Sequence, residues 1–109
     1  MTSECVSKSL ILLELILKAK TPIIVAEIIK KGGEVLANCL TELAYNLLYG
    51  NIGINKREAA ALKPYKNIVR KIADKNIPSS RKVRLLMTNA KIVREIVKLA
   101  APVVKVLAQ

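Results

Sequence analysis

The side chains of this chain that could do chemistry are mostly cations, and they are concentrated in one stretch. Eight Lys or Arg residues occur between positions 63 and 84. A dense group of cations is the pattern that neutralises the phosphates of a nucleic acid. We name this group the basic face, and its members are Lys63, Lys66, Arg70, Lys71, Lys75, Arg81, Lys82 and Arg84. The sequence predicts that they form one nucleic-acid-binding surface.

Helical spacing supports this grouping. Lys63, Lys66 and Arg70 are three and four positions apart, so they share one side of a helix. Lys71 and Lys75 lie on the neighbouring row. The short link over residues 76–78 should bring the first turns of the next helix, with their exposed N–H groups, close to that row. Cations in the first turns of a helix oppose its dipole at a cost of about 0.3–1 kcal/mol each, which indicates an anionic partner.

The charge is divided unevenly along the chain. Residues 1–50 contain five Lys and five Glu, whereas residues 51–109 contain fourteen Lys or Arg and three acidic residues, so the net charge of +11 lies in the second half. Duplex DNA is the favoured partner, bound without sequence specificity because no groove-reading module is recognisable. Phe and Trp are absent and only three Tyr occur, which argues against stacking of single-stranded bases. RNA as the partner, and a solvated face that binds nothing, remain open alternatives.

Catalytic and metal-binding chemistry has little support in the sequence. Histidine is absent, and the two cysteines, Cys5 and Cys39, are far apart, so neither a zinc site nor a Cys-His nucleophile can be assembled. We find no paired carboxylates, phosphate-binding glycine loop or cofactor fingerprint. We therefore predict a non-enzymatic protein with no cofactor and no metal. Cys39 is expected in the core and Cys5 as a free thiol, which fits a reducing compartment.

No segment has the pattern of a secretory signal or a membrane span. The N-terminus lacks a basic region followed by an apolar run and a small-residue cleavage site. Glu14 and Glu27 interrupt the longest apolar runs, which stay below the roughly 18–20 residues that a membrane span needs. We therefore expect an intracellular protein that is not secreted.

The best-defined element that could position these groups is a helix over residues 34–49. Its apolar side chains fall in two adjacent rows at four-residue spacing, which predicts one wide buried stripe. The stripe consists of Val35, Leu36, Cys39, Leu40, Leu43, Ala44, Leu47 and Leu48. The opposite row should face water and consists of Glu34, Asn38, Glu42 and Asn46. Gly33 precedes the helix, and Gly50 follows it where a left-handed residue commonly ends a helix.

Further helices are expected over residues 4–19, 22–31, 56–75 and 80–107. The 22–31 segment is rich in β-branched residues and could be a strand, but a lone strand has nothing to pair with. Aliphatic residues at helical spacing predict an all-α protein: a compact bundle of four or five helices in a single domain, residues 1–109, with a neutral, aliphatic first half and a strongly basic second half.

Local signals mark several of these helix ends. Thr21 should cap the second helix, with proline in its first turn. Asn55 and Glu58 form a capping box at the start of the fourth. Pro64 should kink that helix, and Ser79 should cap the last one. Residues 91–107 form a basic amphipathic helix, and its apolar side would either pack on the core or lie on an anionic membrane.

Residues 38–86 also contain three runs of characteristically spaced residues. One run contains Cys39, Glu42, Ala44, Asn46, Leu48, Gly50, Asn51 and Ile52, a second contains Lys66, Val69, Arg70, Ile72, Ala73 and Lys75, and a third contains Ser79, Lys82, Arg84, Leu85 and Leu86. In these runs the chain resembles the small basic proteins encoded by polinton (Maverick) transposons and the related adintoviruses. It departs from them after the third run, where residues 88–90 and a charged helix replace a Gly-Gly and an apolar tail.

The resemblance implies an accessory protein associated with a virion or a genome, located in the virion or the host nucleus. Nucleic acid is then the expected partner. The alternative is a helical protein that binds capsid proteins or acts at a membrane surface through its aliphatic surface. This alternative also predicts self-association, so a homo-oligomer is among the candidate assemblies.

Overall fold

The computed structural model describes residues 3–50 and 52–107, with side chains over residues 7–50 and 52–102. The described residues form helices and contain no strand. The helices are α1 (Ser3–Lys18), α2 (Pro22–Leu48), α3 (Lys56–Leu62), α4 (Lys66–Ala73), α5 (Ser79–Thr88) and α6 (Ala90–Leu107), with a 3₁₀ turn at Lys63–Tyr65 between α3 and α4. The predicted all-α bundle is confirmed.

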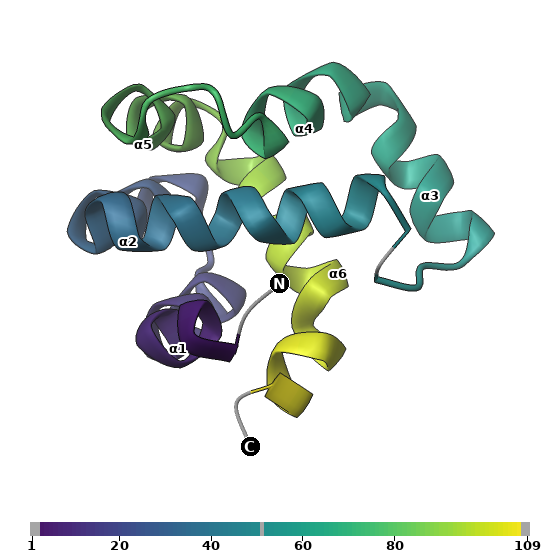
Figure 1. The fold of residues 1–109 in the computed structure, drawn as a ribbon, viewed down its shortest axis with the longest axis horizontal. Coiled ribbons are helices and arrows are strands. Elements are labelled where there is room, and N and C mark those ends of the chain that lie inside the picture. Colours follow the sequence, from purple (N-terminus) through teal and green to yellow (C-terminus); the bar gives the residue numbers. More distant parts are fainter. Residues whose placement is uncertain (1–2, 51, 108–109) are drawn as a thin grey trace.

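Helix α2 lies in the middle of the molecule. It packs against α1, α4, α5 and α6. Figure 1 shows α4 and α5 on one side of α2 and α1 on the other, while α6 crosses behind it. The sequentially distant segments of the chain are therefore joined mainly through this one helix.

The buried stripe predicted on the central helix is confirmed in most positions. Leu36, Leu40 and Leu43 are at most 1 % exposed. Val35 is an exception, since 54 % of it is exposed. Asn46 is a second exception: it was expected to face water but is buried, and its Nδ2 donates a hydrogen bond to the Glu42 carbonyl oxygen at 2.7 Å. This bond satisfies a polar group that packing has removed from water.

The two predicted helices over residues 22–31 and 34–49 form one kinked element. Thr21 caps its start as predicted, because the Thr21 hydroxyl accepts a hydrogen bond from the Ile24 amide. At Gly33 the backbone has φ 57° and ψ −143°, a conformation that side-chain-bearing residues rarely adopt, and the helix axis changes direction there. Gly50, with φ 75°, follows the end of α2 in the predicted left-handed conformation.

The predicted 56–75 helix is divided as its proline implies. The capping box is present, with Asn55 and Glu58 each bonded to the other's backbone amide. Pro64 has no N–H for the Ala60 carbonyl, and the amide of Lys63 bonds that carbonyl instead. The chain tightens into the 3₁₀ turn and then continues as α4, which ends at Ala73.

Two details of the predicted 80–107 helix are wrong. The helix is broken at Asn89, whose Nδ2 bonds the Leu85 carbonyl at 2.9 Å while its own carbonyl starts α6 by accepting from Ile92 and Val93. An asparagine that bonds the preceding turn competes with the helical backbone, which explains the break. Ser79 is not the cap of α5, since its hydroxyl donates to Asn38 Oδ1 on α2 at 3.2 Å.

The apolar side of α6 belongs to the core. Ile92, Val93, Ile96, Val97 and Ala100 are at most 5 % exposed, so this part of the stripe packs against its neighbours instead of facing a membrane. Within the described residues, no helix is long and apolar enough to cross a membrane. Cys39 is buried in the core as predicted, whereas the Cys5 side chain lies outside the described residues.

The centre of the core can be tested at Leu43, which is fully buried on α2. Replacing Leu43 with Ala should lower the free energy of unfolding by about 2–5 kcal/mol, because it removes apolar contacts and leaves a cavity. The matched control is Val35→Ala on the same helix, where the exposed side chain should lose less than about 0.5 kcal/mol. Urea denaturation followed by circular dichroism measures both. Equal losses for the two variants would contradict the assigned core.

Candidate nucleic-acid interface

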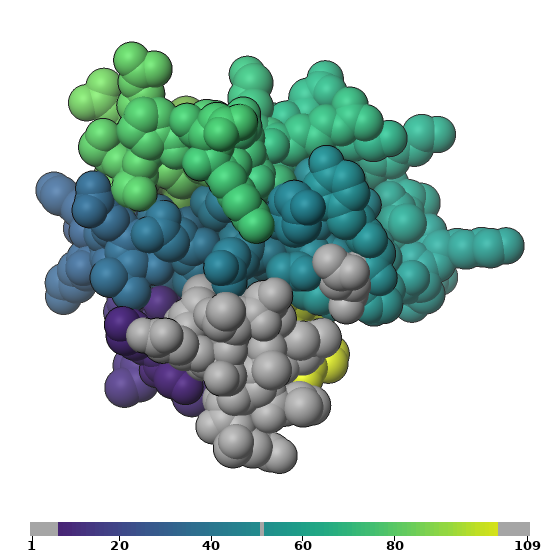
Figure 2. Space-filling model, viewed as in Figure 1, coloured from purple at the N-terminus to yellow at the C-terminus, as the bar shows by residue number. Residues whose placement is uncertain are grey.

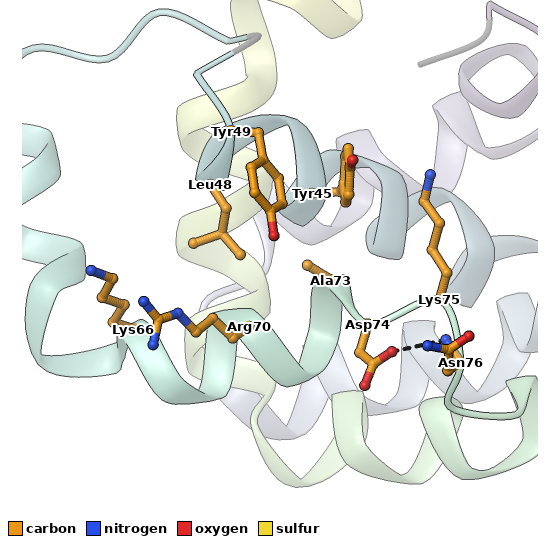
Figure 3. Close-up of a pocket in the computed structure, with 9 residues that line it drawn as sticks. All are labelled: Tyr45, Leu48, Tyr49, Lys66, Arg70, Ala73, Asp74, Lys75 and Asn76. Carbon is orange, nitrogen blue, oxygen red and sulfur yellow. Dashed lines mark hydrogen bonds between the residues drawn. The ribbon is translucent and has the colours of Figure 1, made fainter.

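A pocket of about 570 Å³ lies between the end of α2 and the side of α4. We name it the tyrosine pocket. Its lining consists of Tyr45, Leu48, Tyr49, Lys66, Arg70, Ala73, Asp74, Lys75 and Asn76. Figure 3 shows the two tyrosines projecting from α2 on one wall, with Lys66 and Arg70 on α4 opposite and Lys75 beyond Tyr45. Aromatic rings and cations therefore share one hollow.

The two tyrosines are close to each other because they are one helical turn apart on α2. Their ring centroids are 4.6 Å apart and the ring planes are inclined by 42°. The Lys75 ammonium nitrogen lies 4.3 Å from the centroid of the Tyr45 ring, within the range of a cation–π contact. Tyr49 is the more accessible ring, with 67 % of the residue exposed against 36 % for Tyr45.

The charge of the tyrosine pocket is positive. Lys66, Arg70 and Lys75 line it, and Asp74 is the one carboxylate in its lining, which leaves a formal balance of +2. Lys66 and Arg70 are one turn apart on α4 and both are exposed. Asp74 is engaged locally, because its Oδ1 accepts a hydrogen bond from the Asn76 amide at 2.9 Å. The pocket can therefore attract an anion.

The structure divides the predicted basic face into several parts. Lys66, Arg70 and Lys75 meet at the tyrosine pocket. Lys63 lines a more apolar hollow beside α3, and Lys71 is exposed on α4. Arg81 and Arg84 line a shallow hollow on α5. Figure 2 shows long side chains projecting from the surface that α3, α4 and α5 form on this side of the molecule.

The prediction for Lys82 is wrong, because this residue lies inside the protein and not on its surface. The residue is 2 % exposed. Its ammonium donates hydrogen bonds to Thr41 Oγ1 at 3.0 Å and to the carbonyl oxygens of Ile72 at 2.6 Å and Asp74 at 2.7 Å. These carbonyls belong to the C-terminal end of α4, where a cation is favoured. Lys82 is therefore a structural link between α5, α4 and α2, and phosphates cannot reach it.

A sequence signal for this burial exists. Lys82 precedes Leu86 by four positions on α5, and Leu86 is fully buried, so the two share the inner row of the helix. A similar signal marks the pocket, since Tyr45 and Tyr49 are also four positions apart. What the sequence did not indicate is that these rings lie across from the α4 cations.

Burial lowers the pKa of Lys82 below its ordinary value of 10.5, and the nearby Asp74 carboxylate acts in the opposite direction. The protonated form thus carries a desolvation cost that the Asp74 carboxylate offsets only in part. The folded protein releases this proton at a lower pH than the unfolded chain does.

Among the side chains that the structure describes, no three His, Cys, Asp or Glu lie together as a group that could hold a metal ion. Comparisons with protein-family models, with curated proteins and with solved structures found no match for this chain.

The structural role of Lys82 predicts a loss of stability when its ammonium is removed. Lys82→Met keeps most of the side-chain volume but leaves the Ile72 and Asp74 carbonyls without their donor, so the free energy of unfolding at neutral pH should fall by about 2–4 kcal/mol. Arg81→Met, the neighbouring exposed cation, should change it by less than about 0.5 kcal/mol. Urea denaturation measures both variants. An unchanged free energy of unfolding in Lys82→Met would contradict the assigned role.

The native protein and Lys82→Met should also differ in how their stability depends on pH. Between the lowered folded pKa and 10.5 the unfolded chain binds more protons at Lys82 than the folded chain, so the contribution of Lys82 to stability rises with pH in this window. The stability difference between the native protein and Lys82→Met should therefore grow as pH approaches 10.5. A difference that shrinks over this range would show that the pKa is raised instead.

Proposed function

We propose that this protein binds nucleic acid through phosphate contacts on the exposed members of the basic face and has no enzymatic activity. The observation that carries the proposal is the convergence of Lys66, Arg70 and Lys75 on one pocket with a formal balance of +2. Exposed cations held on helices attract a polyanion and release its counterions on binding. The net charge of +11 on the whole chain acts in the same direction.

Binding of this kind is directed to the backbone of the nucleic acid. Cations that contact phosphates fix the position of the protein but carry no sequence information. The described helices of the basic face are short, and the α4 cations lie beside α2, so we propose no insertion into a DNA groove. Sequence-independent binding follows from this geometry.

The biological setting that fits this activity is a virion or a genome-associated complex, in the virion or the host nucleus. The support is the resemblance of residues 38–86 to the small basic proteins of polintons and adintoviruses. A long viral or transposon genome is a polyanion that needs basic proteins to neutralise it, and a net charge of +11 on 109 residues suits such a task.

One observation favours the alternative function, binding to capsid proteins or to a membrane surface. Ile11 and Leu15 lie one turn apart on α1 and are 73 % and 46 % exposed. An exposed aliphatic pair on a helix can be part of a protein contact. The apolar stripe of α6 does not support the membrane version, because its described part is buried in the core.

The proposed function predicts binding that weakens steeply with salt. If about five of the exposed members of the basic face contact phosphates, log K for a short DNA duplex should fall with log salt at a slope of about −4.5. Lys66→Gln combined with Arg70→Gln should make that slope shallower by about two units, because two phosphate contacts are lost. Fluorescence anisotropy at several salt concentrations measures the slope.

The matched control is Lys30→Gln combined with Lys31→Gln, which removes the same charge from exposed positions on the first half of α2. It should leave the slope nearly unchanged. If both double variants behave alike, binding follows net charge and not this site. Absence of salt-dependent binding to DNA or RNA by the native protein would end the proposal, and flotation with anionic vesicles at high salt would then favour the alternative.

A further inference from the structure

The tyrosine pocket contains a feature that phosphate binding alone does not require. The chain has three aromatic residues, and two of them, Tyr45 and Tyr49, line this one basic pocket. Tyr49 is 67 % exposed, so the core does not need its ring. Sequence composition argued against base stacking because aromatic residues are scarce, but the fold gathers two of the three where the cations are.

The ring arrangement is held in place before any ligand arrives. The Lys75 ammonium lies 4.3 Å from the Tyr45 ring centroid, and that centroid lies 4.6 Å from the Tyr49 ring centroid, so Tyr45, itself in contact with a cation, supports Tyr49 from one side. Leu48, on the same turn of α2, adds apolar lining. A ring that is already oriented loses little freedom on binding, which favours affinity.

The dimensions and polarity of the pocket fit a planar heteroaromatic group with an attached anion. Its volume of about 570 Å³ lies within the range of roughly 300–1,000 Å³ that is usual for small-molecule sites. Figure 3 shows Lys66 and Arg70 at one end of the hollow and Asp74 and Asn76 at the other, with the rings on the wall between them. Phosphates would lie at the first end. The polar groups at the second end could meet the edge of a base.

From this geometry we infer that the tyrosine pocket binds one unpaired base of a single-stranded nucleic acid, stacked on Tyr49, with the adjoining phosphates on Lys66 and Arg70. The inference rests on the proposed function and narrows its ligand. In a duplex the faces of the bases are covered by their neighbours, so only an unpaired base can offer a face to the ring. Base–aromatic stacking is tolerant of sequence, which agrees with binding that has no sequence preference.

The test compares three ligands of equal length: single-stranded oligothymidylate, a DNA duplex, and an abasic strand that keeps the phosphates without the bases. Tyr49→Ala should weaken binding of the single strand about 5- to 150-fold, which is the range for the loss of one stacked base. Binding of the duplex and of the abasic strand should change less than about twofold. Tyr49→Phe keeps the ring and should retain most of the single-strand affinity.

Two further measurements keep the outcome interpretable. Tyr49 is the exposed residue that ends α2, and thermal unfolding should show that Tyr49→Ala folds as the native protein does. The chain has no Trp, so its emission comes from tyrosine, and oligothymidylate should quench more of it than the abasic strand does. Quenching that is equal for the two strands would count against stacking.

The outcomes separate the two proposals. If single strand, duplex and abasic strand all bind in a salt-dependent way and Tyr49→Ala changes none of them, the stacking inference is wrong while the proposed function stands. If none of the three binds at low salt, both are wrong. A loss of single-strand affinity in Tyr49→Ala that Tyr49→Phe restores is the result we expect.

Discussion

The structure depends on the burial of one long helix, α2, in a core that contains no Phe or Trp. Aliphatic side chains cover less area each than aromatic rings, so a stable core needs many of them around a common centre. Helix α2 provides that centre, with Leu36, Leu40 and Leu43 enclosed by the four other helices that pack on it. Burial of α2 then fixes where α1, α4, α5 and α6 lie, including the α4 helix that carries Lys66 and Arg70 of the candidate site.

A buried ammonium connects this core to the candidate site. Lys82 holds the last carbonyls of α4 and a hydroxyl of α2 at once, so the end of α4 cannot shift relative to α2 without breaking these bonds. Arg70 and Lys75 lie on either side of that end and line the same pocket as Tyr45 and Tyr49. Lys82, which the sequence assigned to phosphate binding, thus has a structural role. It holds the end of α4 in place and so positions the cations that remain on the surface.

Most local patterns can be predicted from this sequence, whereas the long-range contacts and one local helix break cannot. Periodicity and caps depend on residues within one turn or two, which is why the stripe on α2 and the Asn55 cap were predicted. The burial of Lys82 depends on the Ile72 and Asp74 carbonyls, which come near it only in the folded chain. The break at Asn89 depended on a side-chain bond that competes with the helical backbone. The meeting of Tyr49 with the α4 cations required knowledge of how α4 packs on α2, and no repeat in the sequence carries that information.

The proposed binding should centre on the tyrosine pocket and the neighbouring α4 cations, and should not involve all the cations of the protein alike. The most direct measurement is a titration of the protein with a short single strand, followed by two-dimensional backbone amide NMR spectra. We expect chemical-shift changes that cluster at residues 45–49 and 66–76, with the signals of Lys30, Lys31 and Lys98 nearly unchanged. Changes of equal size across α2, α5 and α6, or none near the tyrosines, would contradict it.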